Sequence, residues 1–288
     1  MRYDTLAALI ASGALRKSSG PAALIMAEDD VALEATLQHH LQAGFDQLLL
    51  FAPAELELDP ALEAAIERID CDVFAEDALV GVVNRLIDPL AGRWICYGYN
   101  AEFLFFPFCE SRSLRDLISF QSEERREAIL SYVIDLYAPD LTRWPNAVSL
   151  ENAHLDRSGY YALSRQASDG QGVKERQMDF FGGLRWRFEE HIPWDRRKID
   201  RIALFRARQG LRLRPDFTLT DEEMNTYSCP WHHNITTTIC SFRTAKALRT
   251  NPGSRSDISG FLWHRSEPFR WHSQQLMDLG LMEPGQWF

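Results

Sequence analysis

The sequence predicts an α/β fold: an open, mostly parallel sheet with helices on both faces, followed by an irregular C-terminal extension. Over the first hundred residues, short apolar runs alternate with segments of helical periodicity, a pattern typical of strand–helix–strand units with right-handed crossovers. The 288 residues, 45% of them hydrophobic, are enough to bury a large core. Ligands of such sheets bind at the carboxyl ends of the strands.

The first half of the chain supplies these elements in order. A lead-in helix is expected at residues 5–16, and the next helix is expected to be capped by Asp29 or Asp30 and to end at Gly44. Residues 113–138 read as a helix followed by a helix or a strand. The predicted strands are 22–26, 46–53, 71–75 and 94–99, and the predicted helices between them are 28–45, 60–69 and 76–90.

The pattern becomes irregular after about residue 140, where Pro, Gly, aromatic and Arg residues are dense. Only residues 198–207, 235–249 and 272–281 keep an orderly period. No linker composition marks a boundary. We therefore expect one domain over residues 1–288, with an α/β half at 22–140 and a C-terminal part at 141–288.

The net charge of −10 lies entirely in the first hundred residues, and this acidic third disfavours nucleic acid as a partner. The five cysteines are odd in number and lack CxxC spacing, which indicates reduced thiols and a cytoplasmic protein. No apolar run reaches the length of a membrane span, so no transmembrane segment is expected.

One stretch is basic: residues 176–214 hold 11 Lys and Arg against 5 Asp and Glu. Two interpretations stay open for this basic segment. It is a solvated, ion-paired face, or it meets a diphosphate or another anionic group.

Glycine-rich phosphate loops and the GxSxG elbow are absent from the sequence. The histidine pair His39 and His40 falls within a predicted helix, where a position on the helix surface is expected. The pair His232 and His233 stands in "SCPWHHN", which reads as a loop. That pair is structural, or it ligates a divalent metal or donates to a phosphate oxygen.

The stretch "WICYGYNAEFLFF" interrupts two apolar runs with the polar break Tyr99-Asn100-Ala101-Glu102. We interpret the break as the point where a buried strand reaches the surface and presents polar groups. Glu102 is its one carboxylate.

Four segments in this order resemble the family 2 glycosyltransferases of the GT-A fold, in the subgroup whose members carry an Asp-Ala-Asp-Glu-Phe strand end. The matching positions include His40, Gly44, Phe45, Lys198, His232 and His233. The segments are "LIMAEDDVALEATLQHHLQAGFDQLLLF", "WICYGYNAEFLFFP", "RRKIDRIALFRARQGL" and "CPWHH", and together they cover about residues 22 to 250.

The chain departs from that pattern where the family holds its metal. The two aspartates of the motif fall on Tyr99 and Ala101, so only Glu102 and Phe103 remain. The second strand of the family ends in a turn rich in Asp and Asn, but here Ala52 and Pro53 stand in its place.

The resemblance implies the residues of the site. Asp29, Asp30, Asn100, Lys198 and Arg201 would bind the donor. Mn²⁺ or Mg²⁺ would be held by Glu102 with His232 and His233; alternatively the basic segment neutralises the diphosphate without a metal. Glu102 and Asp179 are the candidates for the general base at the acceptor hydroxyl.

The expected function is transfer of a sugar from a nucleotide-sugar donor to a glycan or another hydroxyl acceptor. The alternative is a catalytically inactive relative that binds a glycan, a nucleotide or a protein; an unrelated enzyme on a similar sheet is a third interpretation. If the first holds, the carboxylate of Glu102 should share a cleft with His232 or His233.

Overall fold

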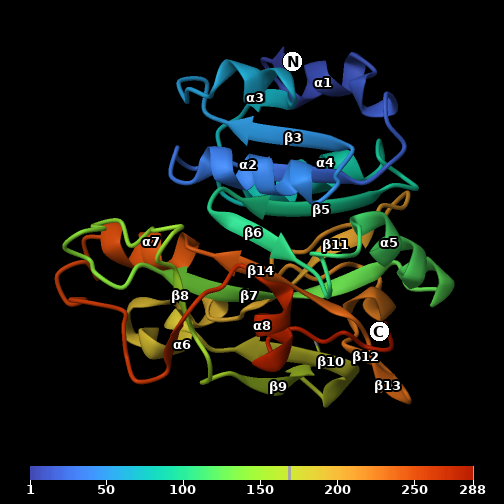
Figure 1. The fold of residues 1–288 in the computed structure, drawn as a ribbon. Helices are drawn as coiled ribbons and strands as arrows, with labels where there is room; N and C mark the ends of the chain where they lie inside the picture. The colour runs from blue at the N-terminus through green and yellow to red at the C-terminus, as the bar shows by residue number, and fades with distance from the viewer. Residues whose placement is uncertain (168–169, 288) are drawn as a thin grey trace. The chain divides into compact units, whose positions relative to one another are not determined.

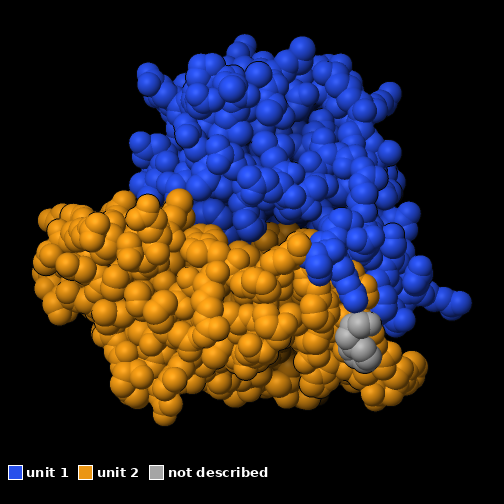
Figure 2. Space-filling view, in the orientation of Figure 1, with its two compact units in different colours: residues 1–103, 111–129, 202–225 blue, residues 104–110, 130–201, 226–288 orange. Residues whose placement is uncertain are grey.

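The computed structural model describes residues 1–167 and 170–287 and has an α/β fold (Figure 1). The chain forms two compact units, coloured separately in Figure 2. The first unit contains residues 1–103, 111–129 and 202–225, and the second contains 104–110, 130–201 and 226–288. Each unit is described by itself below.

The first unit is built on a mixed, mostly parallel sheet with the strand order β1-β4-β3-β2-β5-β11. Strand β11 runs antiparallel to β5, whereas the other neighbours are parallel. The mostly parallel α/β prediction is therefore confirmed. The strands are β1 (Arg2–Tyr3), β2 (Ala22–Met26), β3 (Gln47–Ala52), β4 (Glu67–Asp70), β5 (Trp94–Tyr99) and β11 (Asp200–Arg206). The helices are α1 (Leu6–Ala11), η1 (Ala14–Arg16), α2 (Leu33–Gln42), α3 (Pro60–Ala64), α4 (Ala78–Ile87), α5 (Leu114–Glu123) and η4 (Glu222–Asn225).

Strand β4 corrects two predictions. The helix expected over residues 60–69 ends at Ala64, and residues 71–75 form no strand, because the strand lies at Glu67–Asp70. This strand has the sequence Glu-Arg-Ile-Asp, so it contains no apolar run by which the sequence could predict it. Arg68 is nevertheless buried, because its guanidinium donates to the carbonyl oxygens of Pro53 and Ala54 at 3.1 and 3.2 Å.

Helix α2 begins without a side-chain cap, so the predicted capping by Asp29 or Asp30 is wrong. The residue before the helix is Ala32, which adopts a left-handed conformation with φ 53°. The Asp29 carboxylate instead accepts from the backbone N–H of Val31 at 3.1 Å, two residues on. The other end is as predicted: the chain leaves the helix through Gly44, at φ +97°.

The second unit contains a parallel pair of strands, β7 and β14, and several antiparallel pairs. Strands β6 and β7 start in residues of the first unit, and β11 starts in residues of the second. The strands are β6 (Glu102–Phe105), β7 (Ala128–Tyr137), β8 (His154–Asp156), β9 (Tyr161–Gln166), β10 (Val173–Phe181), β12 (Ser228–Cys229), β13 (His232–His233), β14 (Thr236–Ser241) and β15 (Ser266–Pro268). The helices are α6 (Leu184–Arg187), η2 (Glu189–His191), η3 (Trp194–Arg196), α7 (Arg243–Thr250) and α8 (Ser273–Asp278).

A buried polar network around Asp156 ties this unit together. The Asp156 carboxylate, 1% exposed, accepts from the Tyr137 hydroxyl, from Trp263 Nε1 at 2.7 Å and from Arg187 Nη1 at 3.1 Å. Burial, with the neighbouring Asp156 charge, raises the pKa of Tyr137, so the phenol stays a donor. The network borders an apolar cluster that includes Leu184 and Phe261.

Each of the two units is formed by three segments of the chain. The second unit's longest segment begins at Leu130, but the chain returns to the first unit from Ile202 to Asn225. Within the described residues, no helix combines the length and the hydropathy that crossing a bilayer requires.

Candidate functional site

The carboxyl ends of β2 and β5 meet in the first unit, and Asn100 joins them. The two strands are parallel neighbours, with Met26 paired to Tyr99. The Asn100 side chain accepts from the Glu28 N–H at 2.9 Å and donates to Asp29 Oδ1 at 2.6 Å. A second N–H of its amide donates to the Val31 carbonyl at 3.1 Å. Two predicted donor-binding residues, 71 positions apart, thus lie in direct contact.

Ala101 and Glu102 complete the turn after β5. Ala101 adopts φ 60°, and its N–H donates to the Thr36 hydroxyl at 2.9 Å. The Glu102 carboxylate folds back over the turn and accepts from the Tyr99 N–H at 3.0 Å. A side chain at Gly98 would place its Cβ 3.1 Å from that carboxylate, so the absence of a side chain at Gly98 leaves room for the turn.

Of the polar break, Tyr99 is partly exposed and the other three residues are buried, which corrects the interpretation of its sequence. Asn100 and Ala101 are fully buried, and Glu102 is 2% exposed. Buried polar groups need hydrogen-bond partners. Here they are backbone groups of the β2–α2 connection and of β5, together with the Asp29 carboxylate and the Thr36 hydroxyl. Asp29 is half-buried and Asp30 is exposed, so these two carboxylates are the accessible part of the sheet edge.

His40 lies close to this turn and is buried, so the expected position on the helix surface is wrong for it. Its Nδ1–H donates to the Thr36 carbonyl at 2.8 Å, one helical turn earlier. Burial lowers the pKa of His40 to about 4, and the neighbouring His39 adds to the effect. His39 is half-buried and packs edge-on against Phe103 at 5.4 Å.

Asp179, Lys198 and Asp200 form an ionic cluster in the second unit around the buried Arg165. Arg165 donates to Asp179 Oδ1 at 2.7 Å and to Asp200 Oδ2 at 2.6 Å, while the Lys198 ammonium lies 3.0 Å from Asp179 Oδ1. The Phe180 N–H donates to Asp200 at 2.7 Å. Burial raises the pKa of Asp200 to about 6. The predicted base, Asp179, and the predicted phosphate ligand, Lys198, are therefore partners of each other.

Other cations of the basic segment are also paired. Arg187 belongs to the Asp156 network, and Arg197 contacts Glu189 at 2.9 Å. The Arg185 guanidinium lies 3.8 Å from the buried Asp135, whose pKa is raised by burial. Arg201 is 4% exposed at the start of β11. These contacts support the interpretation of the segment as ion-paired.

His232 and His233 lie on strand β13 of a hairpin with β12, whose tip is Pro230-Trp231, not on an irregular loop. Successive side chains of a strand point to opposite faces. His233 lines a cavity, and the His232 Nδ1–H donates to the His233 carbonyl oxygen at 2.9 Å.

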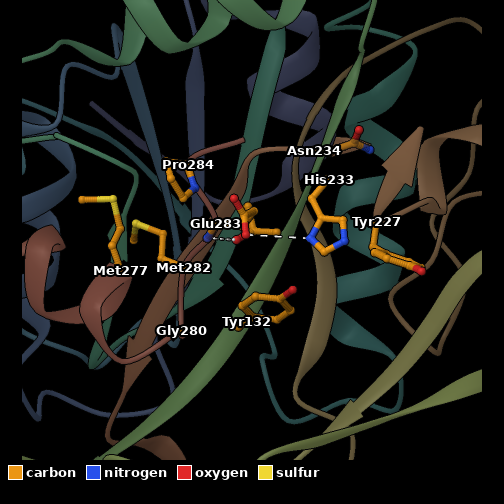
Figure 3. A pocket seen from close by; sticks show the side chains of 10 residues that line it. Tyr132, Tyr227, His233, Asn234, Met277, Gly280, Met282, Glu283 and Pro284 are labelled. Atoms are coloured by element: carbon orange, nitrogen blue, oxygen red, sulfur yellow. Dashed lines mark hydrogen bonds and ion pairs between the residues drawn. The ribbon is translucent and has the colours of Figure 1, made fainter. Parts of the chain in front are cut away.

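The cavity has a volume of about 300 Å³ and is lined by residues of the second unit alone. Figure 3 shows the His233 imidazole and the Glu283 carboxylate turned toward each other, and their closest atoms are 3.8 Å apart. Glu283 Oε1 accepts from the Gly285 N–H at 3.1 Å, which fixes its orientation. Burial raises the pKa of Tyr132, and the charge of Glu283 adds to this, so the phenol beside them is protonated.

The residues predicted to hold a metal are distributed over both units. Glu102, in the first unit, accepts from the Tyr99 N–H, and His232 and His233 lie on β13 in the second unit. Over residues 1–167 and 170–287, no group of three or more His, Cys, Asp and Glu side chains could hold a metal ion.

Sequence reasoning missed Glu283, Tyr132 and Tyr227 as lining residues of the cavity. Glu283 is 50 positions from His233 and stands in no recognisable motif. Two hydrogen bonds between Glu283 and Thr236, three residues after His233, bring it there: one joins backbone groups, and the other joins the Glu283 N–H to the Thr236 hydroxyl.

The comparisons with known proteins add no family to this geometry. No protein-family model matches the chain, and neither does any curated protein.

Proposed function

We propose that this chain transfers a sugar from a nucleotide-sugar donor to a glycan or another hydroxyl acceptor, as a GT-A-like protein. The observation that carries the proposal is the contact between Asp29 and Asn100 at the carboxyl ends of two parallel strands. Open parallel sheets bind ligands at this edge. The proposed donor site consists of Asp29 and Asp30, with Asn100 holding Asp29 in place.

The chemistry of this site favours the neutral part of the donor. Carboxylates accept hydrogen bonds from hydroxyl groups, so Asp29 and Asp30 suit the sugar hydroxyls of the nucleotide. They repel a diphosphate. We propose that transfer at this site is independent of a metal, because the Glu102 carboxylate is buried and already accepts from the Tyr99 N–H.

A thermal-shift series with UDP-, GDP-, CMP- and dTDP-sugars, with and without Mn²⁺, tests the donor site. At a ligand concentration of 100 times Kd, binding should add about 2.7 kcal/mol to the free energy of unfolding. We expect one donor to raise the melting midpoint, equally in EDTA and in Mn²⁺. Asp29→Asn should abolish this shift, because it removes the charge but keeps the oxygen that accepts from Asn100.

The exposed Glu57→Gln is the matched control, since it also neutralises a carboxylate of the first unit. A donor shift that persists in Asp29→Asn, or the lack of any shift with all four donors, would contradict the proposed donor site. Activity that requires Mn²⁺ would contradict the metal-independent part alone.

Lys198→Ala separates the two interpretations of the basic segment. Because the Lys198 ammonium is already paired with Asp179, we expect donor affinity to change less than about threefold and stability by at most about 1 kcal/mol. Titration of the donor into the variant measures this. A loss of donor binding, with activity insensitive to EDTA, would instead assign the phosphate charge to Lys198.

The burial of Glu102 favours a second candidate, an inactive relative that binds through the same fold. In that case the turn after β5 is only a structural element. Binding of a glycan without any nucleotide-sugar shift would support this alternative.

A further inference from the structure

The cavity that contains His233 has a neighbour of different chemistry. A second cavity, of about 250 Å³, is lined by Tyr160, Tyr161, Phe180 and Phe181 together with apolar residues. Tyr132 and Gly280 line both cavities, so the two adjoin across these residues. We call the first the polar compartment and the second the aromatic compartment. Both lie wholly within the second unit.

The polar compartment offers hydrogen-bonding groups of both kinds. The Glu283 carboxylate accepts, the Asn234 amide accepts and donates, and the phenols of Tyr132 and Tyr227 do both. On the left of Figure 3 lie the thioethers of Met277 and Met282, which give the compartment an apolar side. A ligand here must present several hydroxyl or amide groups on one edge.

The aromatic compartment offers flat apolar faces. Tyr161 is 42% exposed and stacks on Phe181, with ring centroids 5.2 Å apart and an angle of 16°. Phe180 packs against Tyr132 at 4.8 Å. Such faces accept the C–H face of a saturated ring as well as an aromatic ring.

The charge of the lining excludes anionic ligands. Among the described lining residues of the two compartments there is no Lys or Arg, and Glu283 is the one acidic residue. Proteins commonly bind phosphates and carboxylates through Lys and Arg. A nucleotide or an acidic sugar would meet the negative charge of Glu283 here, and His233 is the one group of the described lining that can become cationic.

The polar compartment is also rigid. The backbone N–H of Thr236 donates to the Glu283 carbonyl at 2.9 Å, and the Glu283 N–H donates to the Thr236 hydroxyl at 2.8 Å. Gly285, at φ +60°, lies so close to the chain that a Cβ would sit 3.0 Å from the Ile235 nitrogen. A site held in this way loses little entropy on binding.

We propose that the two compartments together bind an uncharged disaccharide unit, with one ring in each. A sugar ring has both features that the lining demands, hydroxyl groups on its edge and an apolar C–H face. The volumes suit small rings, since drug-sized ligands occupy pockets of about 300–1,000 Å³. As the acceptor site of a transferase this inference rests on the proposed function, but as a carbohydrate site it stands without it.

Saturation-transfer NMR on the full chain, with maltose, cellobiose, lactose and N,N′-diacetylchitobiose, tests this proposal. We expect at least one disaccharide to bind with Kd below about 1 mM and to receive saturation on both rings. Glu283→Gln should weaken it at least about tenfold, because it removes a charged acceptor while keeping the oxygen that faces Gly285. Tyr161→Ala should remove saturation from one of the two sugar rings. Tyr132→Phe removes one hydroxyl of the polar compartment and should weaken disaccharide binding without affecting the fold.

Two variants of the second unit are the matched controls: the exposed Glu151→Gln and Trp231→Ala, whose indole is 80% exposed and lines neither compartment. Both should bind as the native chain does. The proposal is overturned if no disaccharide binds, if glucose binds as tightly as the best disaccharide, or if glucose 6-phosphate is preferred. The proposal is also overturned if Glu283→Gln and Tyr161→Ala both bind the disaccharide as the native chain does. Loss of the nucleotide-sugar shift in Asp29→Asn is a separate readout, so this site and the donor site fail independently.

Discussion

Replacing Asp156 with Ala is expected to lower the free energy of unfolding by about 3–5 kcal/mol. The variant removes the acceptor shared by Tyr137, Trp263 and Arg187 and leaves a guanidinium that is 11% exposed without its carboxylate. Breaking a buried pair by removing one partner costs more than the pair contributes, because the remaining charge stays desolvated. Chemical denaturation at neutral pH measures the difference.

The matched control is Asp195→Ala, since Asp195 is exposed. Its effect should stay within about 0.5 kcal/mol. If both variants unfolded at the same denaturant concentration, the Asp156 network would not stabilise the fold as proposed. Asp156→Asn separates charge from shape, because the amide oxygen still accepts from Trp263 while the counter-ion of Arg187 is lost.

His40 should make the protein lose stability as the pH falls from about 6.5 to about 4. Burial depresses the pKa of His40 to about 4 in the folded chain, whereas a histidine in an unfolded chain titrates near 6.5. Between these values the unfolded state binds the extra proton, so acid favours unfolding. Over this pH range the free energy of unfolding falls by about 3 kcal/mol, and it is fully retained above about pH 6.5.

The variant His40→Asn retains an N–H near Nδ1 and does not titrate. We expect its stability difference between pH 7 and pH 4 to be smaller than that of the native chain by about 3 kcal/mol. His264 is exposed, so His264→Asn is the control and should show the same stability difference between pH 7 and pH 4 as the native chain. Asp200, with its raised pKa, adds stability in acid, so only the difference between the two chains isolates His40. Identical pH profiles for the native chain and His40→Asn would refute the assignment.

The strands that sequence predicts well are those whose apolar runs coincide with complete burial. Strands β2 and β5 match the predicted ranges residue for residue, and every residue of β2 is buried. Strand β4 was missed because its outer residues are charged and its buried Arg68 finds backbone acceptors. The capping of α2 was mispredicted because Asp29 has a competing partner, Asn100, that lies 71 positions away in the sequence.

The candidate site was predictable where it depends on strand ends and unpredictable where it depends on pairing between distant segments. Parallel strands bring Asp29 and Asn100 to one edge, which an alternating pattern of strands and helices already implies. Glu283 reaches His233 through backbone pairing with Thr236, and no periodicity encodes that pairing. The likeness of "YNAEF" to a metal motif gave no sign that Glu102 is buried with its carboxylate folded back on the Tyr99 N–H.

The placement of β11 has a consequence for synthesis of the chain. Strand β5 pairs with β2 on one side and with β11 on the other, yet about one hundred residues separate β5 from β11 in the sequence. While a ribosome makes that intervening stretch, the β5 edge has unpaired N–H and C=O groups that can recruit other strands. The first unit cannot close until residues 202–225 have emerged, so the nascent chain needs protection from aggregation while the residues between β5 and β11 are made.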